Sequence, residues 1–130
     1  MIILVPSVMN CSAGGKAIST QVLPVEIEQV SSLEEIKNEP EKVLTLAQSY
    51  FGRQQYDEAL VCVRLVIGDF EGTLYSDHAY YMRGLIYVDI LNFHRDIQKA
   101  AAAFRMVISS PPESDFDKLA QTELDRIKDV

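Results

Sequence analysis

The pattern of apolar positions is repeated in two stretches of the chain, Leu46–Val66 and Gly84–Val107. In the first stretch the small, aromatic and branched residues fall in the order Ala47, Tyr50, Tyr56, Ala59, Val63 and Val66. In the second stretch the corresponding order is Gly84, Tyr87, Ala100, Phe104 and Val107. Spacings of three, four and seven residues place such positions on one face of a helix. A period of roughly 35 to 40 residues built from pairs of helices predicts a helical repeat.

The small residues of this pattern are expected where helices cross. Ala47 and Gly84 occupy equivalent positions in the first helix of each pair, and Ala59 and Ala100 do so in the second. A small side chain lets two helix backbones approach closely, so that larger apolar residues nearby can fill the interface. We therefore predict that Gly84 is a contact between crossing helices rather than a loop glycine.

Capping residues and helix breakers divide the chain into six expected helices, the first of them short. Ser31 to Glu35 forms a capping box that opens a helix reaching about Asn38, and Pro40 suits the first turn of the next helix. Pro111-Pro112 breaks the chain before the last helix. The five longer helices are expected at Pro40–Phe51, Tyr56–Ile67, Asp77–Leu91, Ala100–Ile108 and Phe116–Lys128. The helix at 77–91 is the most apolar, so we expect it to be central and covered on both sides.

Leu60–Ile67 is ambiguous when it is considered alone. Its β-branched residues are typical of a buried strand. However, Asp57 and Glu58 suit the first turn of a helix, Gly68 suits its end, and the equivalent stretch Ala100–Ile108 has a helical pattern. We therefore predict a helix, which makes the whole domain all-α, with Cys62 as a residue of its core.

The composition is that of a single soluble domain. Of 130 residues, 48% are hydrophobic and 24% are charged. Residues 1–30 lack a helical period and contain Pro24, so we expect an extended N-terminal tail there and a helical-repeat solenoid at residues 31–130. The net charge of −7 opposes binding to nucleic acid or to an anionic lipid surface.

The candidate chemistry is sparse. Cys11 and Cys62 lie in different settings, and neither His78 nor His94 has a second ligand at a suitable spacing, so we expect no disulfide, metal or cofactor. The carboxylates fall mostly in first turns of helices and on exposed faces, without a nucleophile and base in a shielded pocket. The sequence therefore predicts a protein that is not an enzyme.

Cys11 is a candidate site of lipid attachment. It follows a short apolar segment and precedes the small, flexible residues Ser12 to Gly15, as a lipid-anchored domain requires. Val8 fits the signal pattern, whereas Asn10 does not, and no Lys or Arg precedes the apolar residues. The alternative is a disordered amino terminus with an incidental free cysteine.

The repeated pattern resembles the tetratricopeptide repeat (TPR). The usual order is Leu-Gly-x-x-Tyr followed by Tyr-x-x-Ala-x-x-x-Phe-x-x-Ala, and here Leu46-Ala47-x-x-Tyr50 and Tyr56-x-x-Ala59-x-x-x-Val63-x-x-Val66 stand in its place. Tyr80 to Leu85, the long turn with Arg95-Asp96, and Ala100 to Phe104 are similar to BamD-type lipoproteins of outer-membrane β-barrel assembly. This resemblance implies a periplasmic protein–protein interaction scaffold, anchored to the outer membrane if Cys11 is lipidated.

Other functions remain open at this point. The alanine-rich stretch before Phe104 is equally similar to CpoB-type periplasmic cell-division coordinators. A generic TPR adaptor, cytoplasmic if Cys11 is not lipidated, and a structural subunit that associates with its own copies are further alternatives. A heat-shock cochaperone is disfavoured, because Leu44 and Gln48 stand where the usual clamp has Lys and Asn.

The expected binding site lies on the inner, concave curve of the solenoid, where stacked first helices place their exposed side chains together. Its predicted residues are Gln48, Phe51, His78, Tyr81 and Leu85. The expected occupant is an extended or helical segment of another protein. Arg83 either pairs with a carboxylate or lays its stem on an apolar surface, and we favour the second interpretation.

Overall fold

The computed structural model describes residues 33–128 and is helical wherever it has regular secondary structure. Residues 33–36 form a short helical turn. The longer helices are α2 (Pro40–Gly52), α3 (Tyr56–Asp69), α4 (Leu74–Val88), α5 (Ile97–Ser109) and α6 (Asp115–Lys128). This confirms the predicted all-α fold. The expected tail at residues 1–30 and Cys11 lie outside the described residues.

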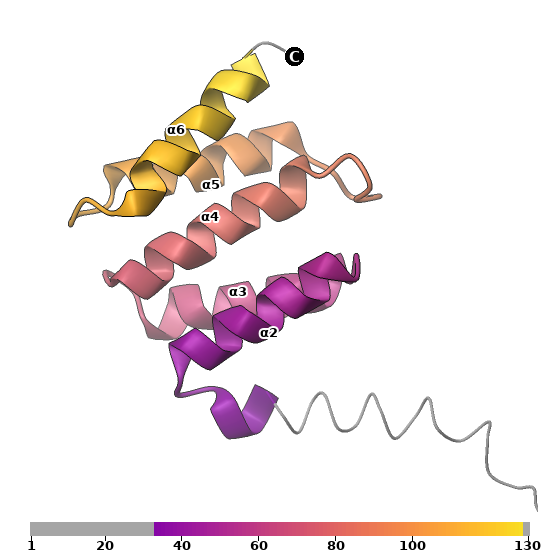
Figure 1. Cartoon of the computed structure of the whole chain (residues 1–130), viewed down its shortest axis with the longest axis vertical. Helices are drawn as coiled ribbons and strands as arrows, with labels where there is room; N and C mark the ends of the chain where they lie inside the picture. The colour runs from indigo at the N-terminus through magenta and orange to yellow at the C-terminus, as the bar shows by residue number, and fades with distance from the viewer. Residues whose placement is uncertain (1–32, 129–130) are drawn as a thin grey trace, which may run out of the picture. The chain divides into compact units, whose positions relative to one another are not determined.

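The helices pack in consecutive pairs, as a TPR-like repeat requires. Helix α2 packs against α3, and α4 packs against α5. Figure 1 shows α2, α4 and α6 side by side in one layer, with α3 and α5 behind them. Helix α4 contacts α2, α3, α5 and α6, which confirms that it is the central element.

The core lies between the two layers and includes the repeated apolar positions. Its largest fully buried apolar side chains are Phe104, Ile86, Val43, Val63, Val66 and Val107. Leu60–Ile67 is part of α3, so the predicted helix is correct there despite its β-branched residues. Cys62 is fully buried in the core, and burial raises the pKa of its thiol to about 11.

Gly84 lies where α4 crosses α5. A Cβ atom at this position would lie 2.7 Å from Cδ1 of Phe104 and closer still to Cε1 and Cζ. The ring of Phe104 therefore occupies the space that any side chain at residue 84 would need. This confirms that Gly84 is a contact between crossing helices.

The boundaries of α4 differ from the predicted Asp77–Leu91. The helix begins earlier, at Leu74, because Thr73 caps it: its Oγ1 accepts a hydrogen bond from the backbone nitrogen of Ser76 at 3.4 Å. It also ends earlier, at Val88, because Asp89 has an extended backbone with φ −62° and ψ 125°. The apolar pattern continued through residues 90 and 91 and so concealed this end.

The two turns within the repeats are built differently. The turn from α2 to α3 is short, and Gln54 adopts a left-handed backbone with φ 61°. The connection from α4 to α5 is longer, and Asp96 ends it by accepting a hydrogen bond from the backbone nitrogen of Lys99 at 3.0 Å. This cap starts α5 at Ile97, before the predicted Ala100. The predicted break at Pro111-Pro112 is correct, since both residues lie between α5 and α6.

Candidate functional site

The five predicted binding residues lie on α2 and α4, whose stacking forms the front layer of Figure 1. We call the exposed side of this layer the α2–α4–α6 face. Gln48 is exposed, whereas Phe51, His78, Tyr81 and Leu85 are partly buried. The predicted set therefore consists of one exposed polar side chain and four aromatic or aliphatic side chains that retain some exposed surface.

Gln48 and His78 meet across the α2–α4 contact. Their Nε2 atoms lie 3.4 Å apart. An amide nitrogen only donates, so this contact is a hydrogen bond in the neutral tautomer of His78 that carries its proton on Nδ1. The other side of the ring stacks on Phe116 of α6, with centroids 4.6 Å apart and planes inclined by 18°. Burial lowers the pKa of His78, which agrees with a neutral ring at physiological pH.

Tyr81 joins this face to the core. Its ring lies 5.8 Å from Phe104 and 5.7 Å from Phe116, measured between centroids. Burial raises the pKa of the Tyr81 hydroxyl, the Glu123 carboxylate raises it further, and Arg126 opposes this rise. Tyr81 is thus both part of the face and a packing residue between α4, α5 and α6.

The remaining predicted residues have other surroundings. Phe51 makes an edge-to-face contact with Tyr56 at the start of α3, with centroids 5.9 Å apart. Leu85 is partly buried on α4. The structure therefore brings Gln48 and His78 into contact, and connects His78 with Tyr81 through Phe116. It gives Phe51 a different neighbour.

Sequence reasoning did not include α6 in the face. Phe116 was expected only as an apolar residue of the last helix, and its contacts with His78 and Tyr81 depend on how α6 packs against α4. Glu123 lies seven residues after Phe116, a spacing that places both on one side of the helix. That spacing was the feature of the sequence that could have indicated which side of α6 packs toward α4.

Arg83 of α4 contacts an aromatic side chain of the same helix. Its guanidinium carbon lies 5.9 Å from the centroid of the Tyr87 ring, so the cation rests against an aromatic face. No carboxylate within residues 33–128 forms an ion pair with it. This agrees with the favoured interpretation of an arginine lying on an apolar surface.

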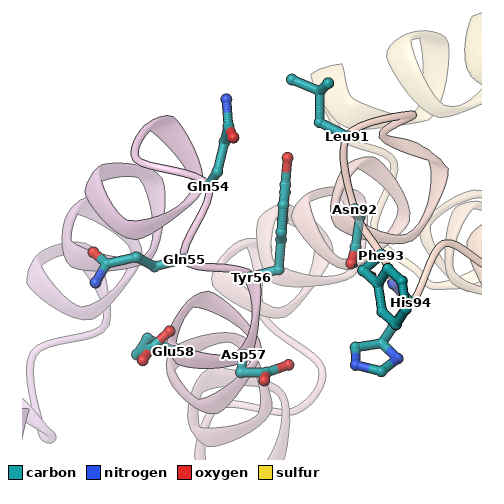
Figure 2. A pocket seen from close by; sticks show the side chains of 9 residues that line it. All are labelled: Gln54, Gln55, Tyr56, Asp57, Glu58, Leu91, Asn92, Phe93 and His94. Carbon is teal, nitrogen blue, oxygen red and sulfur yellow. Dashed lines mark hydrogen bonds between the residues drawn. The ribbon is translucent and has the colours of Figure 1, made fainter.

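A second feature was not anticipated from the sequence. A pocket of about 420 Å³ lies between the α2–α3 turn and the α4–α5 connection. Its walls are Gln54–Glu58 on one side and Leu91–His94 on the other, as Figure 2 shows. Within the first wall, the side chain of Tyr56 is the one that extends between Gln54 and Asn92. We call this feature the turn pocket.

Hydrogen bonds hold the α4–α5 wall of the turn pocket in place. Asn92 is buried, its Nδ2 donates to the carbonyl oxygen of Ile86 at 2.8 Å, and its Oδ1 accepts from the backbone nitrogen of His94 at 2.9 Å. Asp89 accepts from the Tyr56 hydroxyl at 3.0 Å and from the backbone nitrogen of Leu91 at 3.0 Å. The long connection is therefore fastened both to α4 and to the start of α3.

Neither a metal site nor a membrane-spanning helix is found within residues 33–128. Among residues 33–128, no group of three or more His, Cys, Asp or Glu side chains is arranged to hold a metal ion. None of the helices in this part of the chain has the length and apolar character needed to cross a membrane.

Comparison with known proteins assigns the family. The family model YfiO, described as an outer membrane lipoprotein, matches residues 35–130, which include all of α2 to α6. No curated protein and no solved structure matches the chain. The helical pairs described above agree with the TPR-type architecture of this family. The chain therefore belongs to the YfiO family of outer membrane lipoproteins.

Proposed function

We propose that this protein is a non-catalytic scaffold of the BamD type in outer-membrane β-barrel assembly. The observation that carries the proposal is the family match over residues 35–130. The α2–α4–α6 face supports it, because stacked first helices present partly exposed aromatic side chains together with the accessible Gln48. Repeat proteins use such surfaces to bind extended or helical segments of other proteins.

The chemistry of the described residues favours a scaffold over an enzyme. Cys62 is the only cysteine among them, and a fully buried thiol with a pKa of about 11 carries almost no thiolate at neutral pH. The buried side chain of Asn92 and the partly buried side chain of Asp89 are engaged in holding a connection together. These groups therefore have structural roles, and we expect partners to bind at the surface.

The family also supports a periplasmic location with an anchor in the outer membrane. Cys11, which lies outside the described residues, is the proposed acceptor of the lipid. One acyl chain gives only marginal membrane binding, so stable anchoring requires more than one. A protein with Cys11→Ala should leave the membrane fraction, whereas unchanged partitioning would contradict this anchor.

Site-specific photo-cross-linking in native cells tests the proposed binding face. A photoreactive side chain at Gln48 is exposed on the α2–α4–α6 face, and one at Arg105 is exposed on α5. We expect position 48 to cross-link to a component of the β-barrel assembly machinery or to one of its substrates. Position 105 is the matched control.

The alternatives predict different products. A cross-link between two copies of the chain at position 48 would indicate self-association. A cell-division protein as the product would indicate a coordinator of the CpoB type. Cross-linking to assembly components from position 105 alone would place the binding surface on the other layer.

A further inference from the structure

We infer that the turn pocket binds a short segment of a partner protein in which a basic side chain is flanked by apolar side chains. The pocket lies at the connections within the two repeats, whereas the proposed function uses the α2–α4–α6 face. It is therefore a second interaction surface. Its walls, charges and rigidity each support this occupant.

The α4–α5 wall presents large apolar side chains to solvent. Phe93 is 92% exposed and Leu91 is 62% exposed. Both line the turn pocket, and Figure 2 shows them across it from Gln54 and Tyr56. Exposed apolar side chains that line one pocket can contribute apolar area to an interaction site. A partner that covered Phe93 would gain the burial of a whole aromatic ring.

The facing wall is acidic. Asp57 and Glu58 lie in the first turn of α3, and neither forms an ion pair with a Lys or Arg in the described part of the chain. Arg53 and Arg95, the basic residues directly next to the two walls in sequence, have other contacts. Arg53 lies over the ring of Tyr50, and Arg95 Nε donates to the carbonyl oxygen of Val88 at 3.0 Å. The carboxylates are thus available to a cation from outside.

Charge also discriminates between occupants. The net charge of −7 and the carboxylates of the wall repel an anionic lipid surface. A second acidic copy of the same chain would bring like charges together. A partner that supplies Lys or Arg meets complementary charge, and its aliphatic stem can lie along Leu91 and Phe93.

The pocket is already formed without an occupant. A volume of about 420 Å³ is within the range of preformed ligand sites. The hydrogen bonds of Asn92 and Asp89 hold its α4–α5 wall against α3 and α4. Little ordering is therefore required on binding, which favours recognition of a short segment.

Titration of the full ¹⁵N-labelled chain with a synthetic peptide tests the inference. The probe is a Gly/Ser peptide that carries Leu-Arg-Leu at its centre, and the matched peptide carries Leu-Glu-Leu. We expect saturable shifts of the backbone amides of Gln54–Glu58 and Leu91–His94 with the first peptide only. Affinity should fall as salt is increased, because the contact is partly electrostatic.

Variants at both walls sharpen the test. Asp57→Asn combined with Glu58→Gln, and separately Phe93→Ala, should each weaken binding by about tenfold, as expected for a charge pair and an aromatic anchor. Glu41→Gln removes another first-turn carboxylate, from α2, and Ile90→Ala truncates another exposed residue of the connection. Neither residue lines the pocket, so both controls should leave the affinity unchanged.

Three results would overturn the inference. The first is equal binding of the Leu-Glu-Leu peptide, and the second is a set of shifts confined to the α2–α4–α6 face. The third is the absence of saturable shifts up to about 1 mM peptide, because a Kd above that concentration is too weak for a specific binding site. The cross-linking at Gln48 is independent of all three. Failure of the turn pocket and failure of the proposed scaffold function are therefore distinguishable.

Discussion

The two repeats solve the same packing problem with different pairs of side chains. In the α2–α3 pair, Ala47 and Val63 occupy the repeated positions, and both are fully buried. In the α4–α5 pair the equivalent residues are Gly84 and Phe104, and the ring of Phe104 fills the space above Gly84. A larger residue on one helix is thus matched by a smaller one on the other. The two repeats therefore divide the buried volume differently between these two positions.

The turns of the two repeats also reach the same result, an antiparallel helix pair, by different means. The short α2–α3 turn depends on backbone conformation, with Gln54 in the left-handed region. The longer α4–α5 connection also depends on side chains, because Asn92 bonds the Ile86 carbonyl near the end of α4, and Asn92 and Asp89 accept hydrogen bonds from backbone nitrogens of the connection itself. Its extra length carries the exposed Phe93 and Leu91 that form one wall of the turn pocket.

The largest effect is expected where the packing pairs differ. Gly84→Leu should destabilise the protein by about 1 to 3 kcal/mol, because the new side chain overlaps the Phe104 ring and forces α4 and α5 apart. Thermal unfolding followed by circular dichroism measures the effect. A variant that melts at the wild-type temperature would contradict the packing described for Gly84.

A double-mutant cycle sharpens this result. Gly84→Ala and Phe104→Val together install the pair found in the first repeat. Each change alone should destabilise the protein, the first by overlap and the second by leaving a cavity. The two changes together should cost less than the sum by about 0.5 to 3 kcal/mol, the usual range for coupled neighbours. Strict additivity would show that the two positions are independent.

A smaller effect is expected from the long connection. Asn92→Ala removes a buried amide that bonds the Ile86 carbonyl and the His94 nitrogen, so it should cost about 1 to 2 kcal/mol in the free energy of unfolding. Urea denaturation measures the loss. The exposed Ile90→Ala serves as a control within the same connection and should have little effect. Equal losses in the two variants would argue against the structural role of Asn92.

The smallest effect is expected in the short turn, and it has the opposite sign. Gln54→Gly should stabilise the protein by up to about 1 kcal/mol, because glycine adopts a φ of 61° without the strain that a Cβ causes. The greater freedom of glycine in the unfolded chain offsets part of this gain. Gly68→Ala, in the last turn of α3 with no atom within 4 Å of the added Cβ, is a comparison for the effect of glycine on the unfolded chain. A destabilised Gln54→Gly variant would contradict the assigned turn geometry.

Some features of this protein were determined by its sequence. Local periodicity and caps depend on residues close together in the chain, which explains why α2, α3 and α6 were predicted nearly to their ends. The helical state of Leu60–Ile67 followed from its correspondence with the second repeat. The crossing role of Gly84 followed from the repeat as well, because a small residue at a fixed position of each pair implies a close approach.

Other features were decided only by tertiary structure. The neighbours of His78 and Tyr81 depend on Phe116, which the packing of α6 brings to them. The turn pocket arises because Asp89 and Tyr56, 33 residues apart, are hydrogen-bonded and hold two turns together. The sequence of neither turn contains a pattern that predicts its contact with the other turn. Periodicity reports which side of a helix is buried, whereas the partner that buries it is set by how all the helices fill the core together.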